Sequence, residues 1–195
     1  MNVIYAAYDA EGVYVYQAFR PKIVAWAVKH QYFGKGFGLE RMSWIKPSLG
    51  WILRRSKYAT KNRMTAIAQV KISHQAWLHL LEQSIPTHFS VADFAEEHLW
   101  KQSLDRSDVI HQWDPERALN GKRLDRQAIQ VGLRGEALRY YAQDAILEIK
   151  DVTALALEIG QVVKKRGNQF PEVLEEREYE ISTELKRRLG YGTWT

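Results

Sequence analysis

Alternating apolar and polar positions near the start of the chain predict that it begins with strands. Within residues 3–19, VIYAAY and VYVYQAF carry aromatic and β-branched side chains in a period of two. The DAEG between them supplies turn residues, so this segment is predicted to be a β-hairpin. Residues 64–72, 128–133 and 145–149 have similar patterns and are also predicted to be strands.

Apolar residues at helical spacing separate these strands. We predict helices over residues 21–31, 74–83 and 135–142. Another helix is predicted to begin at Pro47, because proline suits the first turn, and to expose Arg54 and Arg55 near its C-terminus.

Shorter signals describe several of the remaining segments. Three glycines make residues 34–38 a predicted loop, and residues 42–45 suit a short strand. Ser90 with Asp93 predicts the cap of a helix that ends near Trp100.

The C-terminal part of the chain is predicted to be helical. Asp151 is expected to cap a helical extension over residues 154–195. Within it, residues 164–189 mix basic and acidic side chains, with Glu184 and Arg188 four positions apart, which predicts a solvated helix face.

These elements predict one α+β domain over residues 1–195. A chain of 195 residues is long enough for one compact domain, and no linker or low-complexity segment divides it. We expect a twisted, mainly antiparallel sheet flanked by helices, because the strands outnumber those of a βαβ repeat.

Composition excludes several classes of chemistry. The chain has no cysteine, which rules out disulfides, thiolate metal sites and cysteine nucleophiles. No apolar run approaches the roughly 18 residues of a membrane span, and the N-terminus lacks an apolar run of signal length. We therefore expect a soluble, cytoplasmic protein with no membrane partner.

Positive charge is concentrated in one stretch. The net charge is +5, and residues 40–63 contain seven basic side chains against Glu40 alone. Such local concentration predicts an anionic partner, here a nucleotide or RNA. The candidates for phosphate or nucleic-acid contact are Arg41, Ser48, Arg54, Arg55, Lys61 and Arg117.

The motif RMSWIKPS offers several groups to one phosphate. Lys46 supplies an ammonium, Ser48 a hydroxyl, and the following helix its N-terminal amides. Trp44 is a candidate for contact with a base or ribose. In the alternative interpretation, Trp44 and Trp51 belong to the core and the arginines extend from a helix surface.

QWDPER contains candidates for proton transfer. We interpret it as an Asp-Pro turn after a strand, where functional groups often lie, with Asp114 and Glu116 as catalytic candidates. Trp113 is a candidate for contact with a base or ribose, and Arg117 for contact with a phosphate. The alternative is a structural turn with a surface ion pair.

Two further polar positions lie in apolar strands. Gln130 is either a hydrogen-bonded structural group or a catalytic residue that orients a ribose or base. Tyr16 and Gln17 end a strand and are candidates for base or ribose contact, although aromatic residues in such strands usually belong to the core.

Common catalytic motifs are absent from the sequence. It has no GxxxxGK[ST], GxGxxG, HExxH or GxSxG, and its six histidines include no i,i+4 pair. We therefore predict no metal.

Five motifs carry a resemblance to a known family. VYQAF, RMSWIKPS, RRS, QWDPER and AIQVGL occur in this order, and in them the chain resembles the domain of unknown function 4291 family over residues 3 to about 153. This resemblance implies a family without an activity.

The order of elements is also similar to the first half of ADP-ribosyltransferase-like folds, including the RNA 2'-phosphotransferases. This similarity implies such a fold, with NAD as a candidate cofactor. It puts Tyr16 and Gln17 on the first strand, and Gln130 on the catalytic strand where transferases have a glutamate. Because glutamine cannot act as a general base, the similarity implies phosphate clamping, as in the phosphotransferases, rather than protein ADP-ribosylation.

Two functional hypotheses follow. In the first, the protein is an enzyme acting on a nucleotide or RNA end, with Lys46, Asp114, Glu116 and Gln130 as its catalytic residues. In the second, it is a non-catalytic RNA-binding module. An enzyme should gather these residues in a pocket, whereas a binding module should spread them along a groove.

Overall fold

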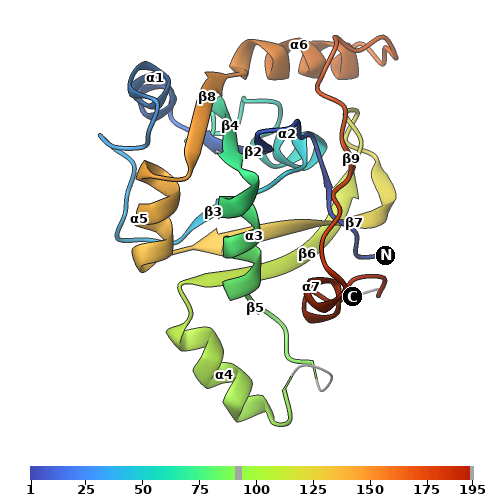
Figure 1. The fold of residues 1–195 in the computed structure, drawn as a ribbon. Coiled ribbons are helices and arrows are strands. Elements are labelled where there is room, and N and C mark those ends of the chain that lie inside the picture. Colours follow the sequence, from blue (N-terminus) through green and yellow to red (C-terminus); the bar gives the residue numbers. More distant parts are fainter. Residues whose placement is uncertain (91–93, 194–195) are drawn as a thin grey trace.

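Two sheets whose strands run in crossing directions form the centre of the molecule (Figure 1). The computed structural model describes residues 1–90 and 94–193. The three-stranded sheet has the order β2-β4-β8 and is antiparallel throughout. The four-stranded sheet has the order β3-β7-β6-β5, in which only the β5–β6 pair is parallel. A short antiparallel pair joins β1 to β9.

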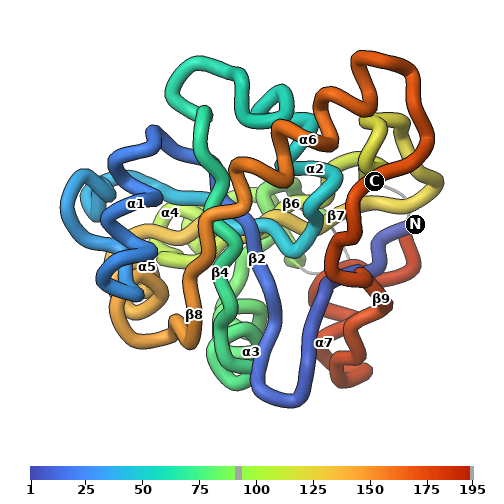
Figure 2. The backbone as a smooth tube through the Cα atoms, turned by 90° about the horizontal axis from the view of Figure 1, so that it is seen from above, coloured from blue at the N-terminus to red at the C-terminus, as the bar shows by residue number. Residues whose placement is uncertain are grey.

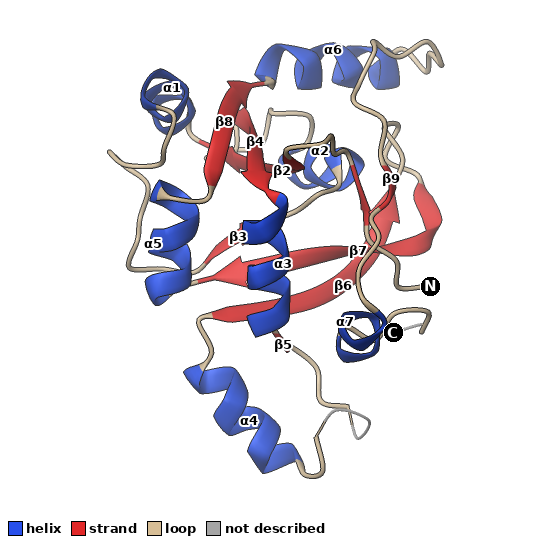
Figure 3. Ribbon diagram, viewed as in Figure 1, coloured by secondary structure: helices blue, strands red, loops and turns tan. Residues whose placement is uncertain are grey.

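The strands are β1 (Tyr5–Ala6), β2 (Gly12–Phe19), β3 (Ser43–Ile45), β4 (Ala66–Ser73), β5 (Ile85–Pro86), β6 (Val109–Arg117), β7 (Arg123–Leu133), β8 (Ile146–Asp151) and β9 (Arg177–Glu178). The helices are α1 (Pro21–His30), α2 (Leu49–Ser56), α3 (His74–Gln83), α4 (Glu97–Arg106), α5 (Gly135–Gln143), α6 (Thr153–Lys164) and α7 (Thr183–Arg188). Figure 3 shows these helices around the strands. The described part of the chain is therefore α+β, with mainly antiparallel sheets, as the sequence predicted.

Helices cover both faces of the β2-β4-β8 sheet, whose strands lie side by side in Figure 2. Because side chains alternate along a strand, Val13 and Val15 of β2 belong to the larger core cluster with α1, α3 and α5. Tyr16 and Ile67 point to the other face, where α2 and α6 cover them. The structure thus has two apolar layers separated by a sheet.

One backbone hydrogen bond joins the two sheets close to Lys46. The Tyr16 amide donates to the Lys46 carbonyl over 2.7 Å, beyond the end of β3. This junction fixes the start of α2 relative to both sheets. The basic stretch of the sequence therefore lies where the sheets meet.

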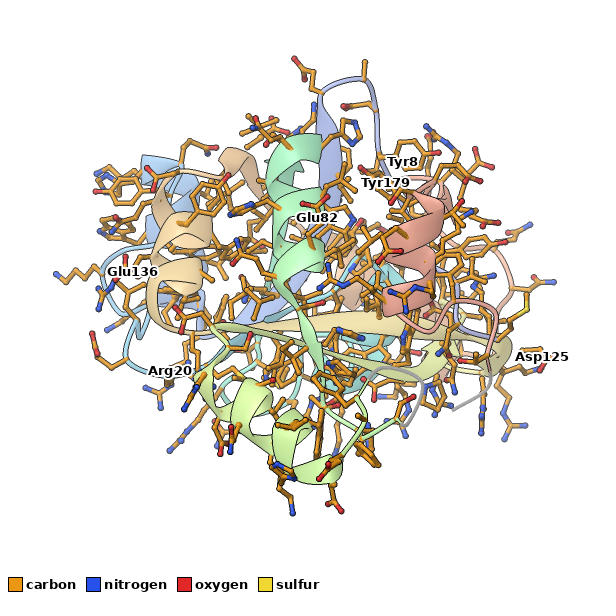
Figure 4. All side chains as sticks on the ribbon, turned by 60° about the horizontal axis from the view of Figure 1, so that its bottom comes forward. Tyr8, Arg20, Glu82, Asp125, Glu136 and Tyr179 are labelled. Carbon is orange, nitrogen blue, oxygen red and sulfur yellow. The ribbon has the colours of Figure 1, made fainter. Side chains whose placement is uncertain are left out.

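The predicted N-terminal hairpin is wrong in its pairing. The turn forms, because Asp9 Oδ1 accepts hydrogen bonds from the amides of Glu11 and Gly12. However, β1 pairs with β9, and the described arms of the turn are joined only next to it, by the Tyr8–Val13 bridge and its backbone hydrogen bonds. The rings of Tyr8 and Tyr179 pack edge to face beside this strand pair, with centroids 5.1 Å apart (Figure 4).

The QWDPER motif is not a turn after a strand. Its residues form the second half of β6 and pair with β7, with a bulge between Pro115 and Arg117. Long-range pairing thus outweighs the local turn preference of Asp-Pro. The consequence for the site is that successive residues of the motif point to opposite faces of the sheet.

The predicted helical extension at the C-terminus needs correction. Residues 164–189 do not form one helix, since only the end of α6 and then α7 are helical there. Glu184 pairs with Arg187 at 2.9 Å, while Arg188 donates to the Glu82 carbonyl. The predicted extension is therefore two helices joined by a largely extended segment.

Smaller differences concern where helices begin and end. Pro47 precedes the α2 N-cap, Ser48, rather than lying in the first turn. Helix α4 begins after Glu96, whose side chain makes no capping hydrogen bond, and ends beyond Trp100. Of the predicted cap, Ser90 with Asp93, Ser90 precedes this start by several residues and Asp93 lies outside the described residues. Among the helices of the described chain, none is both long and apolar enough to cross a membrane.

Candidate functional site

A cavity of about 960 Å³ opens where the end of β2, strand β3, helix α2 and the middle of β6 and β7 meet. We refer to it as the main cavity. Its polar floor comes from neighbouring strands. Gln112 pairs with Gln130 across β6 and β7, and Lys46 follows β3, which pairs with β7 on its other side. Side chains two residues apart share a face, so Asp114 joins this set.

The Lys46 amine is the centre of the cavity floor. Its Nζ hydrogen-bonds to Gln130 Oε1 and lies 3.7 Å from Asp114 Oδ2. It also lies 3.4 Å from the centre of the Trp51 ring, within cation–π distance. The side chain is almost fully buried, with 3% of the residue exposed. A cation held this way is enclosed by aromatic and polar groups rather than by water.

Burial lowers the pKa of the Lys46 amine well below its usual value. The Asp114 carboxylate opposes this shift, and the positive charge of Arg55 adds to it. An amine with a depressed pKa can accept a proton or act as a nucleophile more readily than an exposed lysine. Lys46 thus has the properties of a reactive group as well as of a phosphate contact.

Asp114 and Gln130 retain unused polar atoms at this floor. Asp114 Oδ1 accepts a hydrogen bond from Gln112, whereas its buried Oδ2 has no hydrogen-bond partner in the described structure. The Gln130 amide nitrogen likewise donates no hydrogen bond to any described residue, and Gln130 lines the cavity. Unsatisfied groups of this kind need a partner, and a ligand in the cavity would supply it.

Four arginines surround the cavity: Arg20, Arg41, Arg55 and Arg63. All four are exposed, and within the described chain none of them forms an ion pair with a carboxylate. Arg20, just after β2, is labelled in Figure 4 on the side of the view opposite Asp125. These four charges make the cavity suitable for an anion.

A smaller cavity of about 260 Å³ lies beside the main one. We refer to it as the side cavity. The two share Trp51, Arg55 and Asp114 as lining residues. Arg54, Lys61 and Arg117, all predicted to contact phosphate or nucleic acid, line the side cavity rather than the main one.

Ser48 and Glu116 lie together but away from both cavities. The Ser48 hydroxyl donates to Glu116 Oε1 over 2.6 Å and accepts the Trp51 amide as the α2 N-cap. Glu116 is 1% exposed, and its Oε1 also accepts the Arg117 amide. Burial raises the pKa of Glu116. Neither residue lines a cavity, so their contacts are those of groups that hold the fold.

Glu176 completes this buried group and was not anticipated from the sequence. Its Oε1 accepts the Leu49 amide over 2.6 Å, at the first turn of α2. Burial, together with the nearby Glu116, raises the pKa of Glu176 to about 8. The C-terminal segment is therefore fastened to the start of the helix that carries Trp51 and Arg55.

Of the four candidates for base or ribose contact, Trp44 and Gln17 line the main cavity. Gln17 is already bonded, because it donates to Ser43 Oγ and accepts from the Tyr141 hydroxyl. Tyr16 is 1% exposed, lies in the core between the sheet and α2, and lines neither cavity.

Trp113 also lies outside the cavity. It is adjacent to Asp114 in a strand, so it points to the opposite face, where its indole donates to the Leu189 carbonyl. The structure thus assigns Tyr16 and Trp113 contacts within the fold, and it leaves only Trp44 and Gln17 of this set at the cavity.

The candidates from the sequence did not include Arg20, Ser43, Trp51, Arg63 or Gln112, which line the main cavity together with apolar residues. From the sequence, Trp51 is interpreted only as a core residue. Gln112 could have been found by the period of two, since it lies two residues before Asp114. Arg63 belongs to the basic stretch 40–63, but nothing local distinguishes it from the other basic residues there, and Arg20 lies outside that stretch. Only the fold brings these two to the cavity.

A comparison with protein families matches residues 3–179 to the family described as "Domain of unknown function (DUF4291)". The chain belongs to this family. The match extends beyond the end near residue 153 that the motifs indicated, and it reaches past Glu176. The DUF4291 region thus includes both cavities and the segment that fastens α2. A comparison with curated proteins gives no match for this DUF4291 chain.

Proposed function

We propose that this chain is an enzyme acting on a nucleotide or an RNA end, and that the main cavity binds the substrate. The observation that carries the proposal is four exposed arginines, without carboxylate partners among the described residues, around the buried Lys46 and its partly exposed partner Asp114. Guanidinium groups suit phosphate because they offer several donors in a fixed plane. A phosphate in the cavity would neutralise charges that the described chain leaves unpaired.

Each part of the cavity has a proposed role. Arg41 and Arg55, with Arg20 and Arg63, would bind phosphate oxygens at the mouth. Trp44 offers a face for stacking a base, and the free Gln130 amide would donate to a ribose or base. Positioning and charge stabilisation would supply most of the catalysis, as phosphoryl transfer permits.

Proton transfer is assigned to the Asp114–Lys46 pair. Asp114 Oδ2 lacks a hydrogen-bond donor and would accept a proton from an attacking hydroxyl. Lys46, whose pKa is lowered by burial, would stabilise the negative charge that develops next to it or take up the proton itself. Glu116, proposed from the sequence as an alternative, is less suited because it lies away from both cavities.

Convergence on a cavity favours an enzyme over a non-catalytic RNA-binding module. Asp114 and Gln130 come from two neighbouring strands and Lys46 from the residue after a third, and the three side chains meet at one point, whereas a binding module needs only a basic groove. An ADP-ribosyltransferase-like activity with NAD is a narrower form of this proposal. It is supported by the order of elements and by the cavity's mixture of aromatic and cationic groups.

The experiment is a thermal-shift panel with NAD, ATP, nucleoside 2'- and 3'-phosphates and short RNAs. A ligand at a hundredfold excess over its dissociation constant stabilises the folded state by about 2.7 kcal/mol, which a melting curve resolves. Affinity should weaken as salt rises, because phosphate contacts release counterions.

The matched variants are Arg41→Ala and Lys165→Ala. Arg41 lines the main cavity, while Lys165 is an exposed cation after α6 that lines neither cavity. We expect Arg41→Ala alone to weaken binding, by about tenfold for a lost charged hydrogen bond. No shift with any phosphate ligand, or equal losses in both variants, would contradict the proposal.

A further inference from the structure

The side cavity is strongly basic, and stabilisation of helix α2 accounts for only part of this positive charge. Five of its eight lining residues are basic: Arg54, Arg55, Lys57, Lys61 and Arg117. Within the described residues none of the five forms an ion pair, and Asp114 is the one acid in the lining. Arg54 and Arg55 lie in the last turn of α2, where basic residues offset the helix dipole. That explanation does not extend to Lys61 or Arg117, which come from a loop and from β6.

The loop that carries two of these lysines has an unfavourable backbone. Lys57, Tyr58 and Ala59 are three consecutive non-glycine residues with positive φ, between 52° and 60°. This conformation costs roughly 1–2 kcal/mol per residue for an L-amino acid. Such residues persist where surrounding contacts fix them, and they are frequent at ligand sites.

Several contacts hold this loop in place. The Tyr58 amide donates to the Leu53 carbonyl, the Lys61 amide to the Ser56 carbonyl, and the Tyr58 hydroxyl to the Leu119 carbonyl. The ring of Tyr58 also fills the space that a side chain at Gly160 would need. The positions of Lys57 and Lys61 are therefore fixed relative to α2 before any ligand binds.

The wall between the two cavities suits a chain that passes from one to the other. Trp51, Arg55 and Asp114 face both cavities, so a ligand in the main cavity lies next to the side cavity. A free mononucleotide has a single phosphate, which one group of cations can bind. A polynucleotide can contact both groups, since its phosphates recur along the backbone.

We propose that the side cavity binds the phosphodiester adjacent to the nucleotide in the main cavity, so that the substrate is the end of a polynucleotide rather than a free mononucleotide. This inference rests on the proposed function, because it takes the main cavity as the site of the terminal nucleotide. Arg54, Lys61 and Arg117 would contact the second phosphate, and Trp51 would lie between the two nucleotides.

The test compares a nucleoside monophosphate with a short RNA that ends in the same nucleotide. Affinities are measured by titration for the wild-type protein, for Arg54→Ala/Lys61→Ala and for the control Lys164→Ala/Lys165→Ala. Both double variants remove two exposed or partly exposed cations, but the control pair lies at the end of α6, outside both cavities.

We expect the wild-type protein to bind the RNA at least about tenfold more tightly than the mononucleotide, the gain of one charged contact. Arg54→Ala/Lys61→Ala should abolish that gain, lower the salt dependence of RNA binding, and leave mononucleotide affinity within about twofold. The control variant should leave the ratio of RNA affinity to mononucleotide affinity unchanged. The same measurement is made with a DNA strand of the same sequence. If DNA binds as tightly as RNA, the gain in affinity comes from the phosphate; if DNA binds more weakly, the ribose also contributes.

The outcomes separate this inference from the proposed function. If the mononucleotide binds and RNA gains nothing, the side-cavity inference is wrong while the main-cavity proposal stands. An equal loss of affinity for both ligands in Arg54→Ala/Lys61→Ala would also overturn the side-cavity inference alone. If neither ligand binds the wild-type protein, both proposals fail.

Discussion

The two motifs at the start of α2 and in β6 each divide into an open half and a closed half. Lys46 and Asp114 face the main cavity, with Lys46 Nζ 3.7 Å from Asp114 Oδ2, and among the described residues this buried oxygen has no hydrogen-bond donor. Ser48 and Glu116, each two residues further on, bond to each other and line no cavity. The open half has spare hydrogen-bonding capacity, and the closed half has its carboxylate occupied by donors.

This difference shows that neighbouring polar residues of one motif serve different purposes. The closed half fixes the first turn of α2, with Ser48 as its cap and Glu176 on the Leu49 amide. The open half is held in position as a result. Substitutions in the closed half should therefore change stability, and those in the open half should change ligand chemistry.

The largest expected effect comes from Asp114→Asn in the open half. Loss of a proton-transferring carboxylate typically lowers the rate 10²–10⁴-fold, so we expect turnover of the ligand identified by the panel to fall by about this factor. Affinity and melting temperature should change little, because asparagine retains an oxygen for the Gln112 bond. Chromatographic product analysis measures turnover, titration measures affinity, and a melting curve gives the melting temperature.

Asp125→Asn is the control for this variant, since Asp125 is exposed at the right edge of Figure 4 and lines neither cavity. A folded Asp114→Asn protein with wild-type turnover would remove Asp114 from the mechanism. An unfolded one would place Asp114 in the closed half.

Gly50→Ala should give the largest loss of stability. A Cβ at Gly50 would lie 1.8 Å from the Arg117 carbonyl oxygen, so α2 would have to move away from β6. Overpacking of this kind costs about 1–3 kcal/mol of unfolding free energy, measured by denaturant titration. In Gly38→Ala, the control, the new methyl meets only the flexible Arg41 side chain, and a loss as large there would contradict the explanation.

Ser48→Ala should have a smaller effect, of about 1 kcal/mol, because it removes the α2 cap. The same substitution at Ser182, which caps α7 in the same way, provides the comparison. Ligand affinity should remain that of the wild type, since Ser48 lines no cavity. Weaker binding without loss of stability would mean that Ser48 belongs to the open half after all.

The smallest expected effect is a change in pH dependence with Glu176→Gln. The folded pKa of Glu176, about 8, lies above the usual 4.5, so the folded state holds a proton that the unfolded state releases. Stability should therefore fall as pH rises through this window and level off above about 8. Partial exposure of the side chain limits the size of this effect.

The measurement is the melting temperature of both proteins across that pH range. Glu176→Gln keeps the shape without the titration, so the melting temperature of the wild-type protein should fall by about 1–2 °C more than that of the variant. Parallel pH curves would show that Glu176 ionises freely in the folded protein.

Local patterns in the sequence were sufficient for many elements and for part of the site. Helix α3 matches its prediction, because apolar spacing and a serine cap at Ser73 agree. Charge and buried polarity are visible in a linear sequence, and from them Arg41, Lys46, Arg55, Arg117 and Gln130 are predicted to line one concave site. The structure brings four of them to the main cavity and places Arg117 in the side cavity instead.

Other features depend on contacts between distant residues. Asp-Pro indicates a turn locally, but pairing with β7 makes it a strand. The bulge between Pro115 and Arg117 then gives Asp114 and Glu116 different neighbours. The pairing of β1 with β9 joins segments about 170 residues apart, as does the Tyr8 hydroxyl on the Glu178 carbonyl. No local pattern contains this information.

The position of Trp51 makes its fluorescence sensitive to ligand binding. Its indole borders both cavities and lies 3.4 Å from the Lys46 amine, so a ligand entering either cavity changes the surroundings of this chromophore. Fluorescence emission therefore offers a label-free signal of occupancy. The chain has seven tryptophans, and a difference spectrum against Trp51→Phe would isolate the contribution of this one.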